Sequence, residues 1–170
     1  MGIYGLIGNL VEAKVEFVLV GGLAVTLHGY RRVTLDVDVV LALNDENLSR
    51  FIDCAKAADL RPVLPIPIDA LRDAEFIERA YREKHMLAFA LRGPDMMATV
   101  IDVLVRPVVP YEVLQKNAIS KIIGVHRMQV ASIDDLIVMK TGTGRSKDMI
   151  DIEELIKIKA SLGGNDGQAD

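Results

Sequence analysis

The chain of 170 residues is long enough for one domain with a sizeable core, and its 24 acidic and 20 basic side chains give a net charge of −4. Without tryptophan and without a basic excess, it lacks the general features of a nucleic-acid-binding domain, so an RNA substrate would require a local basic patch. The single cysteine excludes an internal disulfide, and no apolar stretch is long enough to cross a bilayer. With no signal-like N-terminus, we expect a cytoplasmic protein that has no membrane partner.

The first predicted elements are a helix, a buried strand and a second, short helix. Apolar residues recur every three or four positions over residues 3–11, as in an amphipathic helix packed on a sheet. Phe17–Val20 is an apolar run rich in valine, which is typical of a buried strand. Gly21 and Gly22 follow at once, and Leu23–Leu27 is expected to be helical.

The next strand carries the first candidate site. Residues 34–41 alternate so that Asp36 and Asp38 share one face. Two neighbouring carboxylates repel each other unless a cation lies between them, and a diglycine turn at a helix start exposes N–H groups that suit phosphate. Either motif alone is usually structural, a solvated edge or an ordinary turn. Together they indicate phosphoryl or nucleotidyl transfer.

The remaining pattern completes a mixed central sheet flanked by helices. It predicts, in order, a helix over 44–59, a proline-rich loop or edge segment over 61–69, a charged surface helix over 69–82, strands over 85–91 and 98–105 joined by a turn at 92–95, a short helix over 111–116, and a hairpin over 119–123 and 126–130. A helical pair over 132–162, which begins at a capping-box-like Ser132, ends the single domain 1–162. Residues 163–170 are expected to be a disordered tail.

A third carboxylate, Asp102, lies within the apolar strand ATVIDVLV. Burial of a carboxylate there is costly unless a cation or hydrogen-bond donors compensate for it. Asp102 is therefore either a metal ligand or a residue that accepts backbone hydrogen bonds near the exposed end of its strand.

Four basic residues are candidates for binding phosphate. Lys140 continues the inward stripe of its helix, so its amine either reaches into a cleft or extends back to solvent. Arg145 and Lys147 lie at the start of the last helix, where cations oppose the helix dipole unless an anion is bound; alternatively, Lys147 pairs with Asp151 on the surface. Arg32 precedes the strand of the two aspartates and could contact a phosphate or a purine.

The motif Val-Gly-Gly, a spacer and Asp36-Val-Asp38-Val resembles the signature of the nucleotidyltransferase superfamily, which has the polymerase-beta-like fold. The string GGLAVTLHGYRRVTLDVDVV is similar to the small prokaryotic branch that includes abortive-infection toxin nucleotidyltransferases. Many members have serine where Gly22 stands, so a hydroxyl contact to phosphate is missing here. The resemblance implies the minimal nucleotidyltransferase fold, an α/β (α+β) fold in which helices flank a mixed central sheet. It also implies a C-terminal helical pair.

The resemblance also implies transfer of a nucleoside monophosphate from a nucleoside triphosphate, such as ATP, to an unidentified hydroxyl acceptor. Two Mg²⁺ ions, or Mn²⁺, would be held by Asp36, Asp38 and Asp102, the last at the acceptor side. Gly21 and Gly22 would contact phosphate oxygens, and Arg32, Lys140, Arg145 and Lys147 would bind the nucleotide. The acceptor could be RNA, protein or a small molecule.

Two other functions compete with this interpretation. One is a catalytically weak nucleotide-binding or regulatory module, such as one half of a toxin–antitoxin pair. The other is an α/β scaffold for protein interactions, which leaves the inward-facing Asp102 unexplained. An apolar content of 51% is also compatible with a homodimer or a partner protein.

Overall fold

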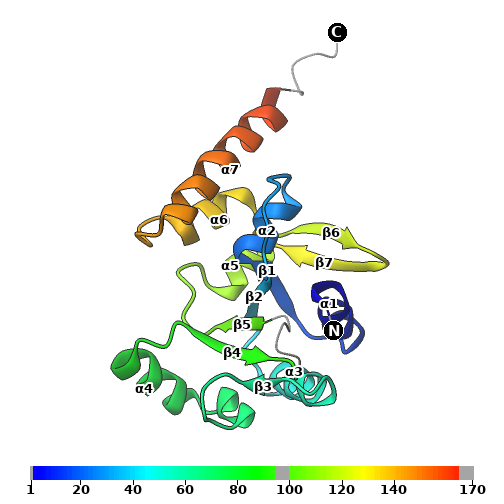
Figure 1. Ribbon diagram of the computed structural model, residues 1–170, viewed down its shortest axis with the longest axis vertical. Helices are drawn as coiled ribbons and strands as arrows, with labels where there is room; N and C mark the ends of the chain where they lie inside the picture. The colour runs from blue at the N-terminus through cyan, green and yellow to red at the C-terminus, as the bar shows by residue number, and fades with distance from the viewer. Residues whose placement is uncertain (1, 95–99, 165–170) are drawn as a thin grey trace.

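A computed structural model describes residues 2–94 and 100–164, which form a mixed sheet flanked by helices (Figure 1). The strands of these residues are β1 (Phe17–Val20), β2 (Asp36–Leu41), β3 (Arg61–Pro62), β4 (Ala88–Arg92), β5 (Val100–Leu104), β6 (Ile119–Ile123) and β7 (His126–Val130). The helices are α1 (Ile3–Glu12), α2 (Gly21–Leu27), α3 (Asp45–Ala57), the 3₁₀ helix η1 (Ile68–Arg72), α4 (Ala74–Lys84), α5 (Tyr111–Asn117), α6 (Ile133–Lys140) and α7 (Ser146–Gly164).

The order of strands in the sheet is β3-β4-β5-β2-β1-β7-β6. The central strand β2 runs antiparallel to β1 and parallel to β5, and in this register Asp38 lies opposite Asp102. Because both central strands are covered, Val37, Val39, Ile101 and Val103 are fully buried or nearly so. The predicted mixed sheet with flanking helices is confirmed.

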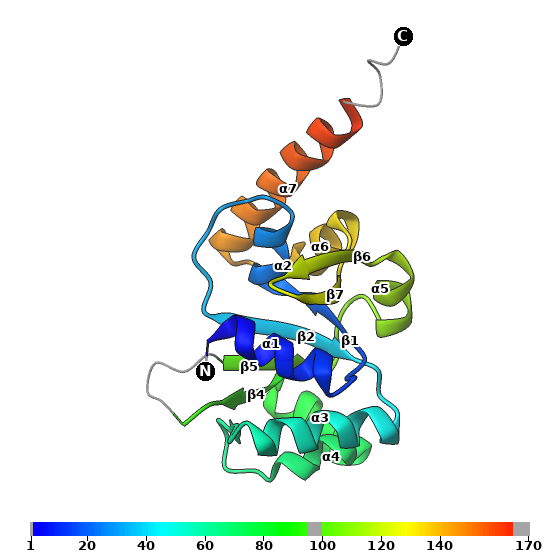
Figure 2. The same ribbon diagram turned by 90° about the vertical axis from the view of Figure 1, so that its right-hand side faces the viewer.

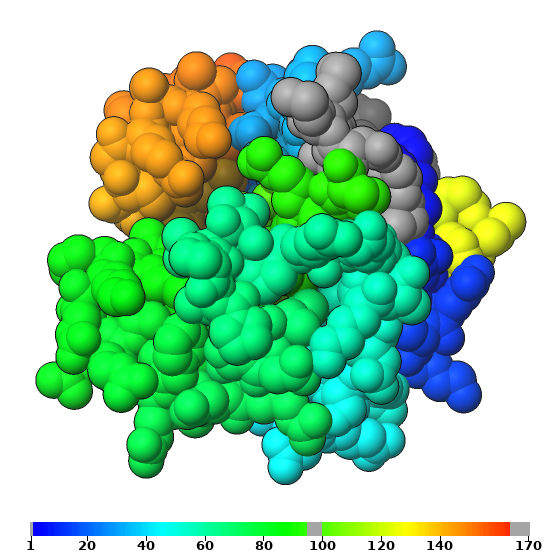
Figure 3. Space-filling model, turned by 60° about the horizontal axis from the view of Figure 1, so that its bottom comes forward, coloured from blue at the N-terminus to red at the C-terminus, as the bar shows by residue number. Residues whose placement is uncertain are grey.

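Two groups of helices lie at opposite ends of the molecule, and α1, α2 and α5 lie beside the central strands between them (Figures 1 and 2). α3 and α4 lie at one end, and the pair α6–α7 lies at the other, with the C-terminal half of α7 projecting beyond the other elements. Figure 3 shows the face built by α3, the following segment and α4. Among the described residues, no helix has both the length and the apolar character that a membrane span needs.

One buried amide fastens α3 to the sheet. The side chain of Asn47 accepts a hydrogen bond from the backbone N–H of Glu16 at 2.7 Å and donates to the carbonyls of Glu16 (2.8 Å) and Ala42 (2.9 Å). These groups precede β1 and follow β2, so Asn47 ties the ends of the two strands together. Buried polar groups that are satisfied in this way fix one arrangement of the backbone.

The segment between α3 and β4 differs from the expected continuous helix over 69–82. Instead, η1 ends at Arg72, and α4 begins after Asp73, whose carboxylate accepts a hydrogen bond from the Phe76 N–H at 2.9 Å. Aspartate competes for backbone donors and favours an N-cap over a helix interior, which explains the break. The predicted turn at 92–95 and the strand start at 98 extend into residues outside the described part. α7 continues to Gly164, and the rest of the predicted tail also lies outside it.

Candidate active site

The site begins with three carboxylates on two neighbouring parallel strands. Asp36 and Asp38 belong to β2, and the register of β2 with β5 places Asp102 beside Asp38. Adjacent strands lie about 4.8 Å apart, so the side chains of Asp38 and Asp102, which point to the same face, are close neighbours. The structure therefore brings together the three aspartates that the sequence singled out.

Burial and nearby negative charge raise the pKa values of Asp38 and Asp102. Burial, followed by the nearby charge of Asp102, raises the pKa of Asp38 to about 6. Burial and the charge of Asp36 also raise the pKa of Asp102. Raised values of this kind are typical of functional sites, because a structural role alone gives no reason to crowd like charges.

The donor set fits a hard divalent cation. Mg²⁺ and Mn²⁺ prefer oxygen ligands, and Asp36, Asp38 and Asp102 offer only oxygen. Within residues 2–94 and 100–164, no three carboxylate, imidazole or thiol side chains already converge as a formed metal site. The register of β2 with β5 nevertheless places Asp38 beside Asp102, where a shared cation would relieve the repulsion between the two carboxylates.

Gly21 leaves room for the carboxylate of Asp38. Its φ is +66°, and a Cβ atom at this position would lie 1.9 Å from Oδ2 of Asp38. The backbone of Gly22 also hydrogen-bonds to Asp38, which lowers the pKa of that carboxyl against the effect of burial. The diglycine therefore makes room for the carboxylate of Asp38 and hydrogen-bonds to it, a role that the sequence analysis missed. Contact between the diglycine and phosphate stays a prediction.

Arg32 and Thr34 fill the space beside Gly22. A Cβ atom at Gly22 would lie 2.6 Å from Nη2 of Arg32 and 3.1 Å from Oγ1 of Thr34. A hydroxyl is thus present next to the glycine after all, but Thr34 supplies it from the segment that precedes β2. The sequence analysis left Thr34 out because no spacing rule connects it with Gly22.

Two buried aspartates of α7 hold the basic residues. Asp151 accepts hydrogen bonds from Nη1 of Arg32 at 2.5 and 2.7 Å and forms an ion pair with Nζ of Lys140 at 2.8 Å. Asp148 accepts from Nζ of Lys140 at 2.9 Å and from Nε of Arg145 at 2.7 Å. The side chain of Lys140 is only 8% exposed, so its amine does not extend back to solvent.

The charges around Asp148 outweigh the cost of its burial. Burial alone raises the pKa of Asp148, but hydrogen bonds from Lys140 and Thr143 and the charges of Lys140 and Arg145 bring the pKa below its ordinary value. The alternative pairing of Lys147 with Asp151 is not found among the contacts of the described residues; Asp151 pairs with Arg32 and Lys140 instead. The Asp-x-x-Asp spacing at the start of an inward-facing helix was the signal that could have identified these partners.

A cavity of about 150 Å³, the carboxylate cavity, brings these groups together. It is lined by Gly21, Gly22, Arg32, Thr34, Asp36, Asp38, Leu104, Leu136, Met139, Lys140, Arg145, Lys147 and Asp148. Every predicted site residue lines it except Asp102, which lies next to Asp38. Carboxylates thus face basic side chains across a small space, an arrangement that can hold a cation and a phosphate chain together.

Comparisons with known proteins bear on the fold. No model of a known protein family matches the chain, and no curated protein matches it. Among solved structures, the lincosamide antibiotic adenylyltransferase LnuA, crystallised with lincomycin, is similar with a TM-score of 0.61 at 15% identity, over 92% of this chain and 95% of that one.

Two further structures are similar. The antibiotic-resistance factor ANT(2'')-Ia gives a TM-score of 0.55 at 12% identity, over 95% of this chain and 91% of that one. An antigenic nucleotidyltransferase-like protein from Paracoccidioides brasiliensis gives 0.53 at 18% identity, over 92% and 72%. At these identities the likeness concerns the fold, and it does not bear on the toxin branch. The chain has the fold of nucleotidyltransferases.

The contact between Gly21 and Asp38 predicts an unequal pair of alanine variants. Gly21 and Gly124 both have positive φ, but a Cβ atom at Gly124 meets nothing within 4 Å. We expect Gly124→Ala to lower the free energy of unfolding by about 1–2 kcal/mol, the cost of a left-handed alanine. Gly21→Ala should cost clearly more, because Asp38 must also move. Urea denaturation of both variants measures the difference, and equal losses would contradict the contact.

The raised pKa of Asp38 predicts that its carboxylate destabilises the metal-free protein. With a folded pKa of about 6 against 3.8, the folded state binds the proton more tightly, so this contribution to stability is lost as pH rises from about 4 to 6. In the presence of a chelator, Asp38→Asn should be more stable than wild type by about 1–3 kcal/mol at about pH 7.5 and equal to it near pH 4. Urea denaturation at both pH values checks this; a variant less stable at the higher pH would refute it.

The contacts of Asp151 predict a large loss on its removal. Asp151→Ala leaves Arg32 and Lys140 without this partner and should lower the free energy of unfolding by about 3–5 kcal/mol. Glu154→Ala on the same helix removes only the exposed pair with Lys157 and should change it by less than about 1 kcal/mol. Chemical denaturation of the two variants compares them. Similar small losses would show that the buried network contributes little.

Proposed function

We propose that the chain is a metal-dependent nucleotidyltransferase that transfers a nucleoside monophosphate from a nucleoside triphosphate to a hydroxyl acceptor. The observation that carries the proposal is the pairing of Asp38 with Asp102 at a cavity whose other wall is basic. A scaffold would gain nothing from two neighbouring carboxylates with raised pKa values. The similar fold of known nucleotidyltransferases supports the same function.

The residues take their roles from their positions. Asp36, Asp38 and Asp102 would hold Mg²⁺ or Mn²⁺, in a two-ion site as the resemblance implies, which when bound neutralises phosphate charge and lowers the pKa of the attacking hydroxyl. Asp102, at the acceptor side, would take the proton of that hydroxyl, since a carboxylate beside the attacking oxygen can act as a general base. The acceptor oxygen then forms a bond to the α-phosphorus while the bond to pyrophosphate breaks.

The basic wall serves the leaving pyrophosphate. Lys140 and Arg32 are fixed by Asp148 and Asp151 before any ligand arrives, so little reorganisation is needed when charge develops on the phosphates. Arg145 is 61% exposed in its side chain and can turn toward a bound triphosphate. Lys147 lines the same cavity.

The solved structures favour ATP and a small-molecule acceptor over RNA or protein. LnuA is an adenylyltransferase crystallised with lincomycin, and ANT(2'')-Ia is an antibiotic-resistance factor. The net charge of −4 also gives RNA no general attraction. The regulatory and toxin–antitoxin alternative has no observation of its own in the structure.

Isothermal titration of MgATP and MgGTP tests the proposal. Wild type should bind at least one of them, and Asp36→Ala/Asp38→Ala should not, because two carboxylate ligands are gone. Glu46→Ala/Asp53→Ala, which removes the same charge from α3, should bind like wild type. Absence of binding to folded wild type with Mg²⁺ or Mn²⁺, or retained binding in the first variant, would falsify the assignment. A positive result justifies acceptor assays with α-labelled nucleotide.

A further inference from the structure

A second and larger cavity lies at the C-terminal ends of β2 and β5, and the proposed function does not yet use it. Its volume is about 590 Å³. Apolar side chains from the two strands, α3 and α4 provide much of its lining, among them Val40, Leu48, Ile77 and Val103. We call it the apolar cavity. Charged side chains complete the lining: Asp45, Arg72, Glu78, Arg106 and Glu112. A volume of several hundred Å³ with a largely apolar lining is typical of sites for small molecules.

The apolar cavity adjoins the carboxylate cavity. Leu104 lines both of them. Leu104 lies two residues after Asp102, and Val40 lies two residues after Asp38, so each strand carries its carboxylate and its cavity residue on the same face. Two residues of a strand span about 6.5–7 Å. A molecule in the apolar cavity can therefore reach the carboxylates with a short substituent.

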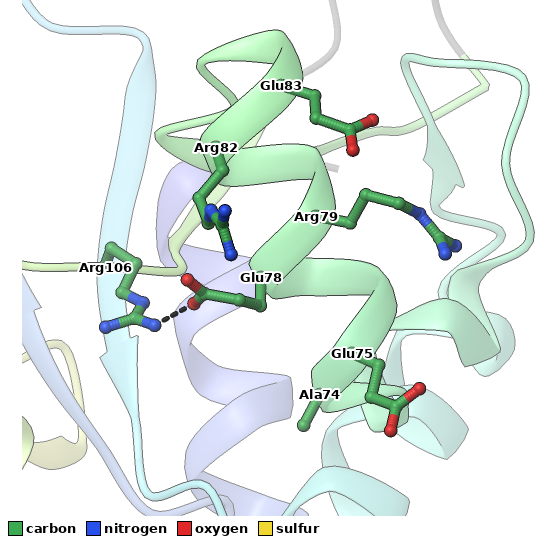
Figure 4. A pocket seen from close by; sticks show the side chains of 7 residues that line it. All are labelled: Ala74, Glu75, Glu78, Arg79, Arg82, Glu83 and Arg106. Atoms are coloured by element: carbon green, nitrogen blue, oxygen red, sulfur yellow. Dashed lines mark hydrogen bonds and ion pairs between the residues drawn. The ribbon is translucent and has the colours of Figure 1, made fainter.

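An ion pair marks the border of the apolar cavity at α4. Arg106, just after β5, pairs with Glu78, and its guanidinium lies 5.7 Å from the centre of the Tyr81 ring. Figure 4 shows this pair in a groove on the outer side of α4 that is lined almost entirely by charged side chains. The apolar cavity shares Ala74, Glu78 and Arg106 with this groove, and it adds Ile77 of α4 together with residues of the two strands.

We propose that the apolar cavity binds the acceptor, and that the acceptor is a small molecule with an apolar body and a hydroxyl group directed past Leu104 toward Asp102. This inference rests on the proposed function and narrows its acceptor class. The hydroxyl oxygen forms the bond to the α-phosphorus, the bond to pyrophosphate breaks, and Asp102 takes the hydroxyl proton. The volume of the cavity suits such a molecule, whereas RNA would need a basic surface.

Binding of a simple probe tests the cavity itself. The probe is 2-(2-naphthyl)ethanol, which has an aromatic body and one hydroxyl, and its affinity is measured by ligand-observed NMR. Leu43 lines the cavity and is 69% exposed, so Leu43→Trp narrows the cavity without disturbing the core. The matched control is Leu87→Trp, at a 65% exposed leucine that lines a different pocket. We expect Leu43→Trp to weaken binding at least about tenfold, the equivalent of 1.4 kcal/mol, and the control to leave it unchanged.

A second measurement requires no substitution in the apolar cavity and reports the orientation of the bound probe. Mn²⁺ added to wild type should relax the CH₂OH protons of the probe more strongly than its ring protons, because the hydroxyl end lies nearer to the carboxylates. In Asp36→Ala/Asp38→Ala the probe should still bind, but without this enhancement. MgATP titrations of the same proteins should give equal affinities for wild type, Leu43→Trp and Leu87→Trp.

Three outcomes overturn the proposal: no binding of the probe to wild type, equal binding to Leu43→Trp, or stronger relaxation of the ring protons. A fourth outcome separates it from the proposed function. If wild type binds the probe in the cavity but neither Mn²⁺ nor nucleotide, the nucleotidyltransferase assignment fails, and the acceptor role fails with it. The cavity would then remain a small-molecule site of another kind.

Discussion

The parallel pairing of β2 with β5 is the constraint on which the site depends. It places Asp38 and Asp102 side by side in a partly buried position, where their repulsion and desolvation oppose folding. The surrounding valine and isoleucine side chains of both strands provide the burial that holds this register in spite of that cost. Because a one-residue slip would turn the carboxylates to the opposite face, the same apolar pattern that stabilises the sheet also fixes the geometry of the site.

The half of the candidate site formed by α6 and α7 differs from the carboxylate half in how its charges are paired. Within the described part of the chain, the carboxylates of β2 and β5 form no ion pair, although the charge of Lys140 acts on Asp38. On α6 and α7, by contrast, basic side chains are already paired with Asp148 and Asp151. The two halves come from the two ends of the chain, and the hydrogen bonds of Arg32 to Asp151 join them across 119 residues. The last helix therefore belongs to the site as well as to the fold, although most of its length projects from the body of the protein.

Much of the fold could be predicted from the sequence, because hydrophobic periodicity and capping residues act locally. The limits of β1, β6 and β7 match the predicted ranges, because the diglycine ends β1 and Gly124 separates β6 from β7. Asn44 and Ser132 cap α3 and α6 as their types suggest. Asp73 interrupts a helix that the sequence predicted to be continuous. Whether an aspartate lies inside a helix or caps its start depends on the neighbours that bury each turn. The three aspartates were accessible to sequence reasoning because a carboxylate in an apolar strand is costly. The partners of Lys140 were not, because they depend on how α7 packs against α6.

The burial of Asp38 against the diglycine has a consequence for the proposed binding of a metal ion. Since the pKa of Asp38 is about 6, the metal-free protein retains a proton on that carboxyl in a substantial fraction of molecules at slightly acidic pH. A divalent cation binds the ionised form, so uptake of the ion releases this proton to the buffer. The apparent metal affinity therefore declines on acidification through this range, and the measured heat of binding depends on the ionisation enthalpy of the buffer. The cavity proposed to hold the cation would thus also exchange protons with solvent.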